Sequence, residues 1–138
     1  MSTDHTTLAR RFFEESDRGR TPGELCGPGF TAHFPGFPPM DLAAYDQFAA
    51  MFHAPFSEIK HPIDEVIGDG DKVAVRLRFE GTHTGEFMGV PASGRHFSVE
   101  GTAFLHVADT KIVDFCGSLD IMGLMQQIGG PPVPSQAG

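Results

Sequence analysis

The spacing of apolar residues changes once along the chain, near Ile59. Before it, apolar residues recur at helical intervals. Leu8, Phe12 and the adjacent Phe13 predict a first helix from about Thr3 to Arg18. Asp41, a favoured N-cap residue, precedes a second predicted helix that runs to about Phe56. Its apolar face is formed by Leu42, Tyr45, Phe48, Ala49 and Phe52.

The segment between these two helices is rich in Pro and Gly. It leaves room for one helical turn within Pro22 to Gly29, followed by a short strand at Phe30 to Phe34. Both are expected to be brief connecting elements.

From Ile59 onward the apolar period approaches two, which predicts antiparallel strands. The expected strands are Ile59 to Ile67, Lys72 to Thr84, Arg95 to Val107 and Lys111 to Leu119, followed by a short helix at Ile121 to Ile128. In the second strand Val73, Val75, Leu77 and Phe79 share one face, and His83 falls on that apolar face by parity. The tail from Pro131 to Gly138 is expected to be mobile.

Helices that precede a run of long strands are typical of an α+β domain with its helices on one face of the sheet. At 138 residues the chain fits one domain, so we expect residues 1–138 to form a single unit with a flexible tail from residue 130.

The composition excludes several classes of partner. The net charge of −8 and the lack of a Lys/Arg cluster oppose nucleic-acid binding. The N-terminus lacks a signal-peptide pattern and no apolar stretch reaches the roughly 20 residues that span a bilayer, so a cytoplasmic protein without membrane contact is expected. Thirteen Phe against one Tyr and no Trp favour a Phe-packed core, with some rings free to line a pocket for a flat hydrophobic ligand. Cys26 and Cys116 are expected to be free thiols.

Four strings carry a family resemblance: GDKVAVRLRFE, GTHTGEFMGVPASG, KIVDF and LDIMGLMQQIG, in that order. Together they resemble the SnoaL-like polyketide (ester) cyclase family. The resemblance implies an NTF2-like cone, in which a curved antiparallel sheet packs against about three helices around a deep apolar pocket. It also implies that no cofactor is bound.

Asp120 is the leading candidate for catalysis. It lies between a strand end and an apolar turn, where desolvation would raise its pKa and make it a better base. The resemblance implies a catalytic Asp at this place. Spacing alone favours a structural role, because Asp is a favoured N-cap for the helix that starts at Ile121, and one residue can serve both roles.

His106 is the second catalytic candidate. By parity it shares a strand face with Glu100 and Phe104, and a hairpin could bring it toward Asp120 unless a bulge intervenes. The resemblance implies a His near this position that hydrogen-bonds a substrate oxygen. An exposed His at the end of the strand is the alternative.

The remaining candidates are predicted to contact substrate. His33 and His83 resemble family positions near the pocket, although each could instead brace a local turn. Cys116 stands where the family often has Trp, and we expect the smaller side chain to widen the pocket or change its ligand. Phe34, Tyr45 and Phe52 complete the predicted substrate-binding set. No HxH, HxxxH or HExxH spacing occurs, so no metal site is predicted.

These observations predict a cofactor-independent cyclase that closes a ring in a hydrophobic, polyketide-derived ester by intramolecular aldol condensation. A non-catalytic small-molecule-binding domain of the same fold, or a hydroxylase or isomerase that uses the same pocket, are the alternatives. We expect a homodimer or homotetramer formed through the outer face of the sheet.

Overall fold

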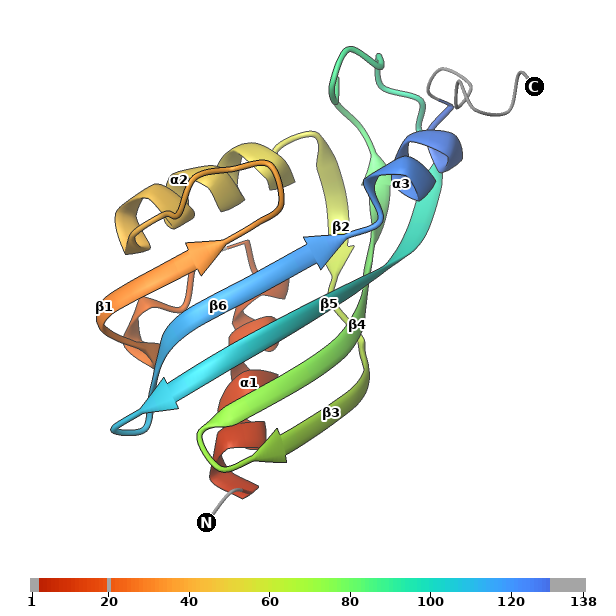
Figure 1. Cartoon of the computed structure of the whole chain (residues 1–138). Helices are drawn as coiled ribbons and strands as arrows, with labels where there is room; N and C mark the ends of the chain where they lie inside the picture. Colours follow the sequence, from red (N-terminus) through yellow and green to blue (C-terminus); the bar gives the residue numbers. More distant parts are fainter. Residues whose placement is uncertain (1–2, 20, 130–138) are drawn as a thin grey trace.

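The computed structural model describes residues 3–19 and 21–129, and Figure 1 traces their path. The helices are α1 (Thr3–Asp17), α2 (Leu42–His53) and α3 (Ile121–Gln127), with a short 3-10 turn at Gly23–Leu25. The strands are β1 (Cys26–His33), β2 (Phe56–Lys60), β3 (Ile63–Asp69), β4 (Lys72–His83), β5 (His96–Ala108) and β6 (Lys111–Leu119). The expected mobile tail lies outside the described residues.

The strands form one six-stranded sheet in the order β1-β6-β5-β4-β2, with β3 also paired to β4. The pairs β4–β5 and β5–β6 are antiparallel, as expected. The edge strand β1 runs parallel to β6, with Ala32 opposite Phe115, so the sheet is mixed and not purely antiparallel. This pairing joins segments more than 80 residues apart, and local periodicity carries no information about it.

The strand predicted from Ile59 to Ile67 is two strands. Pro62 has no amide hydrogen to donate to a ladder, and the amide of His61 donates to the carboxylate of Asp17 at 2.6 Å. The sheet hydrogen bonding is therefore interrupted between β2 and β3. This break takes His61 out of the strand.

Helices α1 and α2 cover one face of the curved sheet, while α3 follows the C-terminal end of β6 and lies beside the N-terminal end of β5 (Figure 1). The N-cap of α2 is Asp41, whose side chain accepts a hydrogen bond from the amide of Ala44 at 2.9 Å. The inner faces of α1 and β6 meet at Phe12 and Phe115, whose ring centroids are 5.1 Å apart. Full burial of such rings contributes roughly 1.5–3 kcal/mol each, which makes this contact a main support of the fold.

The parity prediction for β4 is confirmed. Val73, Val75, Leu77 and Phe79 are buried on the face that carries the helices, and His83 is buried with them. None of the described helices has the length and apolar character to cross a membrane.

Candidate active site

A cavity of about 500 Å³ lies between α2, the C-terminal end of α1 and the inner face of the sheet. Ligand pockets in proteins commonly measure about 300–1,000 Å³, so this one has room for a polycyclic small molecule. Its wall is largely aromatic: Phe13, Phe34, Phe37, Tyr45, Phe48, Phe52, Phe79, Phe87 and Phe115 all contribute. Rings of this kind favour a flat apolar ligand.

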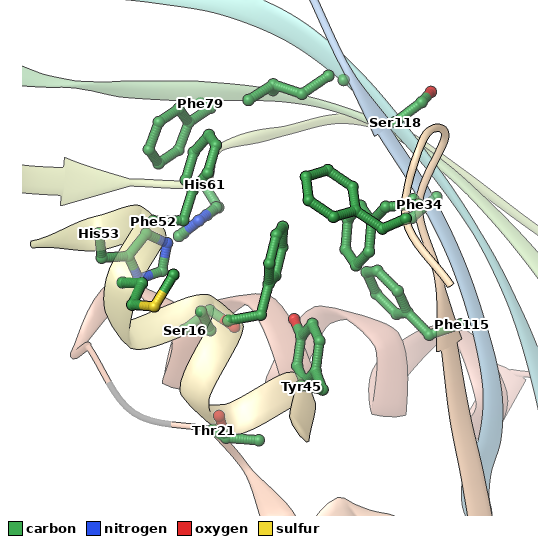
Figure 2. Close-up of a pocket in the computed structure, with 18 of the residues that line it drawn as sticks. Ser16, Thr21, Phe34, Tyr45, Phe52, His53, His61, Phe79, Phe115 and Ser118 are labelled. Carbon is green, nitrogen blue, oxygen red and sulfur yellow. The ribbon is translucent and has the colours of Figure 1, made fainter. Parts of the chain in front are cut away.

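Three of the predicted substrate-binding residues line this cavity: Phe34, Tyr45 and Phe52 (Figure 2). Phe34 and Tyr45 stack at 6.1 Å with nearly parallel planes, and Phe52 contacts Phe79 on the sheet at 5.5 Å. Burial is the main cause that raises the pKa of Tyr45, so its hydroxyl is neutral. The wall is uncharged where these rings meet.

Two histidines form one wall of the cavity, His53 at the end of α2 and His61 after β2 (Figure 2). His61 Nδ1 lies 2.7 Å from Asp17 Oδ1. Because a carboxylate only accepts hydrogen bonds, Nδ1 carries the proton and Nε2 is left with its lone pair. Burial lowers the pKa of His61, and the hydrogen bond to Asp17 opposes that shift.

His53 lies beside His61, with 5.5 Å between the ring centroids, and stacks on Phe79 at 5.8 Å. Burial, and secondarily the neighbouring His61, lower the pKa of His53 to about 4. Both imidazoles are therefore neutral at pH 7. A neutral imidazole has one nitrogen that donates and one that accepts, which suits proton transfer.

The expected enclosed environment of Asp120 is wrong. Its carboxylate is exposed and caps α3, accepting a hydrogen bond from the amide of Gly123 at 2.9 Å. The neighbours on either side, Leu119 and Ile121, do line the cavity. Asp120 is thus placed at the rim, where the helix begins.

The expected approach of His106 to Asp120 is also wrong. His106 pairs with Asp114 near the β5–β6 turn, whereas Asp120 follows the other end of β6. Six residues of strand at roughly 3.3 Å each put them about 20 Å apart. His106 Nε2 lies instead 2.9 Å from Asp71 Oδ2, and this hydrogen bond lowers the pKa of Asp71.

His83 is fully buried but does not line the cavity. Its Nδ1 lies 2.8 Å from the Ser93 hydroxyl and accepts the Ser93 amide at 3.1 Å. Its Nε2 has no hydrogen-bond partner among the described residues. The structure gives His83 the bracing position that the sequence left as the alternative, because it fastens the end of β4 to the following loop.

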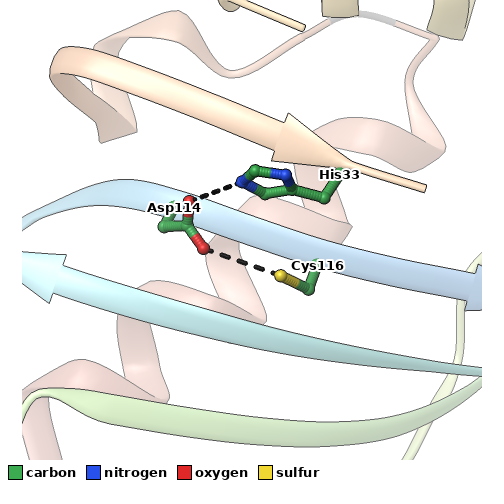
Figure 3. Close-up of side chains that lie close together, drawn as sticks. All are labelled: His33, Asp114 and Cys116. Atoms are coloured by element: carbon green, nitrogen blue, oxygen red, sulfur yellow. Dashed lines mark hydrogen bonds and ion pairs between the residues drawn. The ribbon is translucent and has the colours of Figure 1, made fainter. Parts of the chain in front are cut away.

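His33 and Cys116 lie away from the cavity, on the sheet face opposite α1, with Asp114 between them (Figure 3). His33 Nε2 is 2.9 Å from Asp114 Oδ1, and Cys116 Sγ is 3.6 Å from Asp114 Oδ2. The expectation that Cys116 widens the pocket is wrong, because a β-strand alternates its side chains and Phe115 takes the inner face. Their donor atoms lie within 4.8 Å of one another, a spacing a metal ion could bridge. Both Cys26 and Cys116 are free thiols.

The family model for SnoaL-like polyketide cyclases matches residues 6–128. The chain belongs to the SnoaL-like polyketide cyclase family. An aklanonic acid methyl ester cyclase from Streptomyces peucetius is 33% identical to it over 146 residues, with 97% of each chain covered.

Solved structures show the same SnoaL-like fold. A protein from Jannaschia sp. CCS1 named as a SnoaL-like polyketide cyclase superposes with a TM-score of 0.81 at 26% identity, covering 95% of both chains. The protein IdmH from Streptomyces antibioticus, also named as a polyketide cyclase, gives a TM-score of 0.82 at 28% identity, covering 89% of this chain and 96% of that one.

For this SnoaL-like chain, sequence reasoning missed Asp17, His53 and His61. His53 follows Ala49 by four residues and therefore continues the apolar face of α2, a signal present in the sequence. Asp17 and His61 are 44 residues apart, and no spacing rule relates them. Only the fold brings them together.

Proposed function

We propose that the protein closes a ring in a polyketide-derived methyl ester by intramolecular aldol condensation inside the aromatic cavity. The observation that carries the proposal is this cavity, of about 500 Å³ and walled by aromatic rings, in a SnoaL-like chain. It is supported by the similarity to an aklanonic acid methyl ester cyclase along nearly its whole length.

The reaction requires two proton movements and no change of oxidation state. A base removes a proton from a carbon activated by carbonyl groups, and the resulting carbanion attacks a second carbonyl of the same molecule. One carbon–carbon bond forms, the carbonyl π bond becomes an alkoxide, and the alkoxide takes a proton. The product of this addition is an isomer of the substrate.

The cavity favours this step by holding one conformation of the ligand. Stacked side chains such as Phe34 and Tyr45 confine a flat ring system and exclude water. Pre-orienting two reacting carbons in this way can lower the barrier by several kcal/mol, up to roughly 7–11 in well-oriented systems.

Asp120 enters this proposal as a rim residue that takes part in proton transfer. Support comes from its position between Leu119 and Ile121, which both line the cavity. Asn is as good an N-cap as Asp, so Asp120→Asn preserves the cap of α3 while removing the proton-accepting carboxylate. We expect this variant to unfold at the same urea concentration as the wild type and to cyclise more slowly. Unchanged turnover would remove Asp120 from the mechanism.

The proposal is tested by incubating the protein with aklanonic acid methyl ester in air and under nitrogen. A cyclase yields an isomer of the same mass in both atmospheres. A binder gives only ligand-induced thermal stabilisation, and a hydroxylase gives an oxygenated product that needs air. Either of these two results contradicts the proposal.

We further propose that copies of the chain associate through the outer sheet face. Phe104 on this face is 61% exposed, and it lies opposite the exposed Cys116 on β6. Light scattering should report a dimer or tetramer for the wild type and smaller particles for Phe104→Asp. A wild-type monomer would contradict this.

A further inference from the structure

We propose that Asp17, His61 and His53 form an interior proton-transfer site: His61 accepts the proton of a β-dicarbonyl carbon, and His53 donates a hydrogen bond to the enolate oxygen. This inference rests on the proposed function and names the groups that it leaves open. It also specifies the substrate, since the paired acceptor and donor fit a carbon acid with a carbonyl oxygen close beside the acidic carbon.

Asp17 fixes both the position and the tautomer of His61. One oxygen, Oδ1, accepts the backbone amide of His61 at 2.6 Å and its ring Nδ1 at 2.7 Å. Two bonds from one residue to one oxygen leave the imidazole little freedom to rotate. The remaining nitrogen, Nε2, keeps its lone pair and can accept a proton.

Aromatic side chains surround the His61 ring on the cavity wall. Its ring lies 5.5 Å from Phe79 and 6.2 Å from Phe13, and its side chain is only 10% exposed. An acceptor in such a setting acts on a bound ligand without competition from solvent. Asp120, by contrast, is open to water at the rim.

His53 complements His61 with a donor. Among the described residues none forms a hydrogen bond with the His53 ring, although it lines the same wall. A neutral imidazole keeps one N–H, which can stabilise negative charge as it develops on a carbonyl oxygen. Within the described cavity wall the other titratable groups are Tyr45 and Asp46, both on α2.

The proton balance closes within the site. His61 Nε2 takes the carbon-bound proton and becomes an imidazolium whose charge is offset by the Asp17 carboxylate. The enolate carbon then bonds to the second carbonyl carbon, and the electron pair of that π bond moves to oxygen. The imidazolium passes its proton to this alkoxide by way of the Asp120 carboxylate at the rim, so His61 and Asp120 both end the cycle in their starting states.

Hydrogen–deuterium exchange tests the site without relying on ring closure. Methyl benzoylacetate, a small aromatic β-keto methyl ester, is incubated in deuterated buffer near pH 6, and proton NMR follows loss of the signal from its acidic carbon. We expect the wild type to accelerate exchange over buffer, and His61→Gln to lower the protein-dependent rate by about 10²-fold or more. His96→Gln, which alters an exposed His bonded to Thr82, serves as the matched control and should exchange like the wild type.

Nitrogen-15 NMR of the wild-type imidazoles keeps the test independent of how the variant folds. The proposal expects His61 to be protonated at Nδ1 and unprotonated at Nε2. The opposite tautomer, no acceleration by the wild type, or equal exchange by a folded His61→Gln would each overturn the inference. His61-dependent exchange without ring closure of aklanonic acid methyl ester would support this site and contradict the proposed function alone, whereas ring closure that persists in His61→Gln would contradict this inference alone.

Discussion

Asp17 holds His61 through a single carboxylate oxygen, which lies 2.6 Å from the backbone nitrogen of His61 and 2.7 Å from its ring Nδ1. The pair joins the last residue of α1 to the break between β2 and β3. Pro62 interrupts the sheet at this point, and the two hydrogen bonds fix His61 there as part of the cavity wall.

Asp17→Asn should change the pH profile of ring closure. The hydrogen bond and charge of Asp17 raise the pKa of His61 against the lowering effect of burial. Without the charge that pKa falls further, so neutral His61 persists to lower pH and the acid limb of kcat/KM shifts downward. The plateau rate falls as well, because a weaker base removes the proton less readily.

The control for this measurement is Asp64→Asn, which removes an exposed carboxylate near Arg76. It should leave the profile where the wild type has it. An acid limb that stays in place in Asp17→Asn would show that Asp17 does not act through His61.

His53 should make the protein lose stability as the solution is acidified. Its pKa falls from 6.5 in the unfolded reference to about 4 in the folded protein. Below pH 6.5 the unfolded chain binds the proton and the folded one does not, so stability drops between about pH 6.5 and 4. The full shift corresponds to a loss of up to about 3 kcal/mol.

Urea unfolding at pH 7.5 and pH 4.5 measures this effect. His53→Gln removes the titrating group, so its free energy of unfolding should fall less between the two pH values than that of the wild type. Equal falls in both proteins would be inconsistent with a buried, neutral His53.

Ala49→Phe should fill the cavity while leaving the fold intact. Ala49 lies on the cavity face of α2, where a larger side chain enters open volume. We expect the melting temperature to change little and the stabilisation by aklanonic acid methyl ester to be lost. Ala43→Phe adds the same ring on an exposed part of α2 and should bind ligand normally. Binding retained by Ala49→Phe would place the ligand elsewhere.

Local pattern predicted the elements well. The period of two in β4 gave the buried face from Val73 to Phe79 correctly, because alternation depends only on the backbone of one strand. Helix α2 and its Asp41 cap were also predicted, since capping is decided within a few residues.

The site depended on relations that no local pattern contains. Parity placed His106 on the same face as Phe104. Because His106 lies close to the β5–β6 turn, it pairs with Asp114 near the start of β6 and is far from Asp120 at the other end. The sequence left open whether Asp120 caps α3 or acts in catalysis, and in the structure its carboxylate caps that helix. The Asp17–His61 pair exists only because α1 packs beside the β2–β3 junction.

The central claim, ring closure in the cavity, is tested most directly by carbon NMR of aklanonic acid methyl ester before and after incubation with the wild-type protein. We predict that one carbonyl carbon is converted to a carbinol carbon joined to the former acidic carbon, in a product of unchanged mass. A substrate recovered without a new carbon–carbon bond, although bound by the protein, would contradict the account.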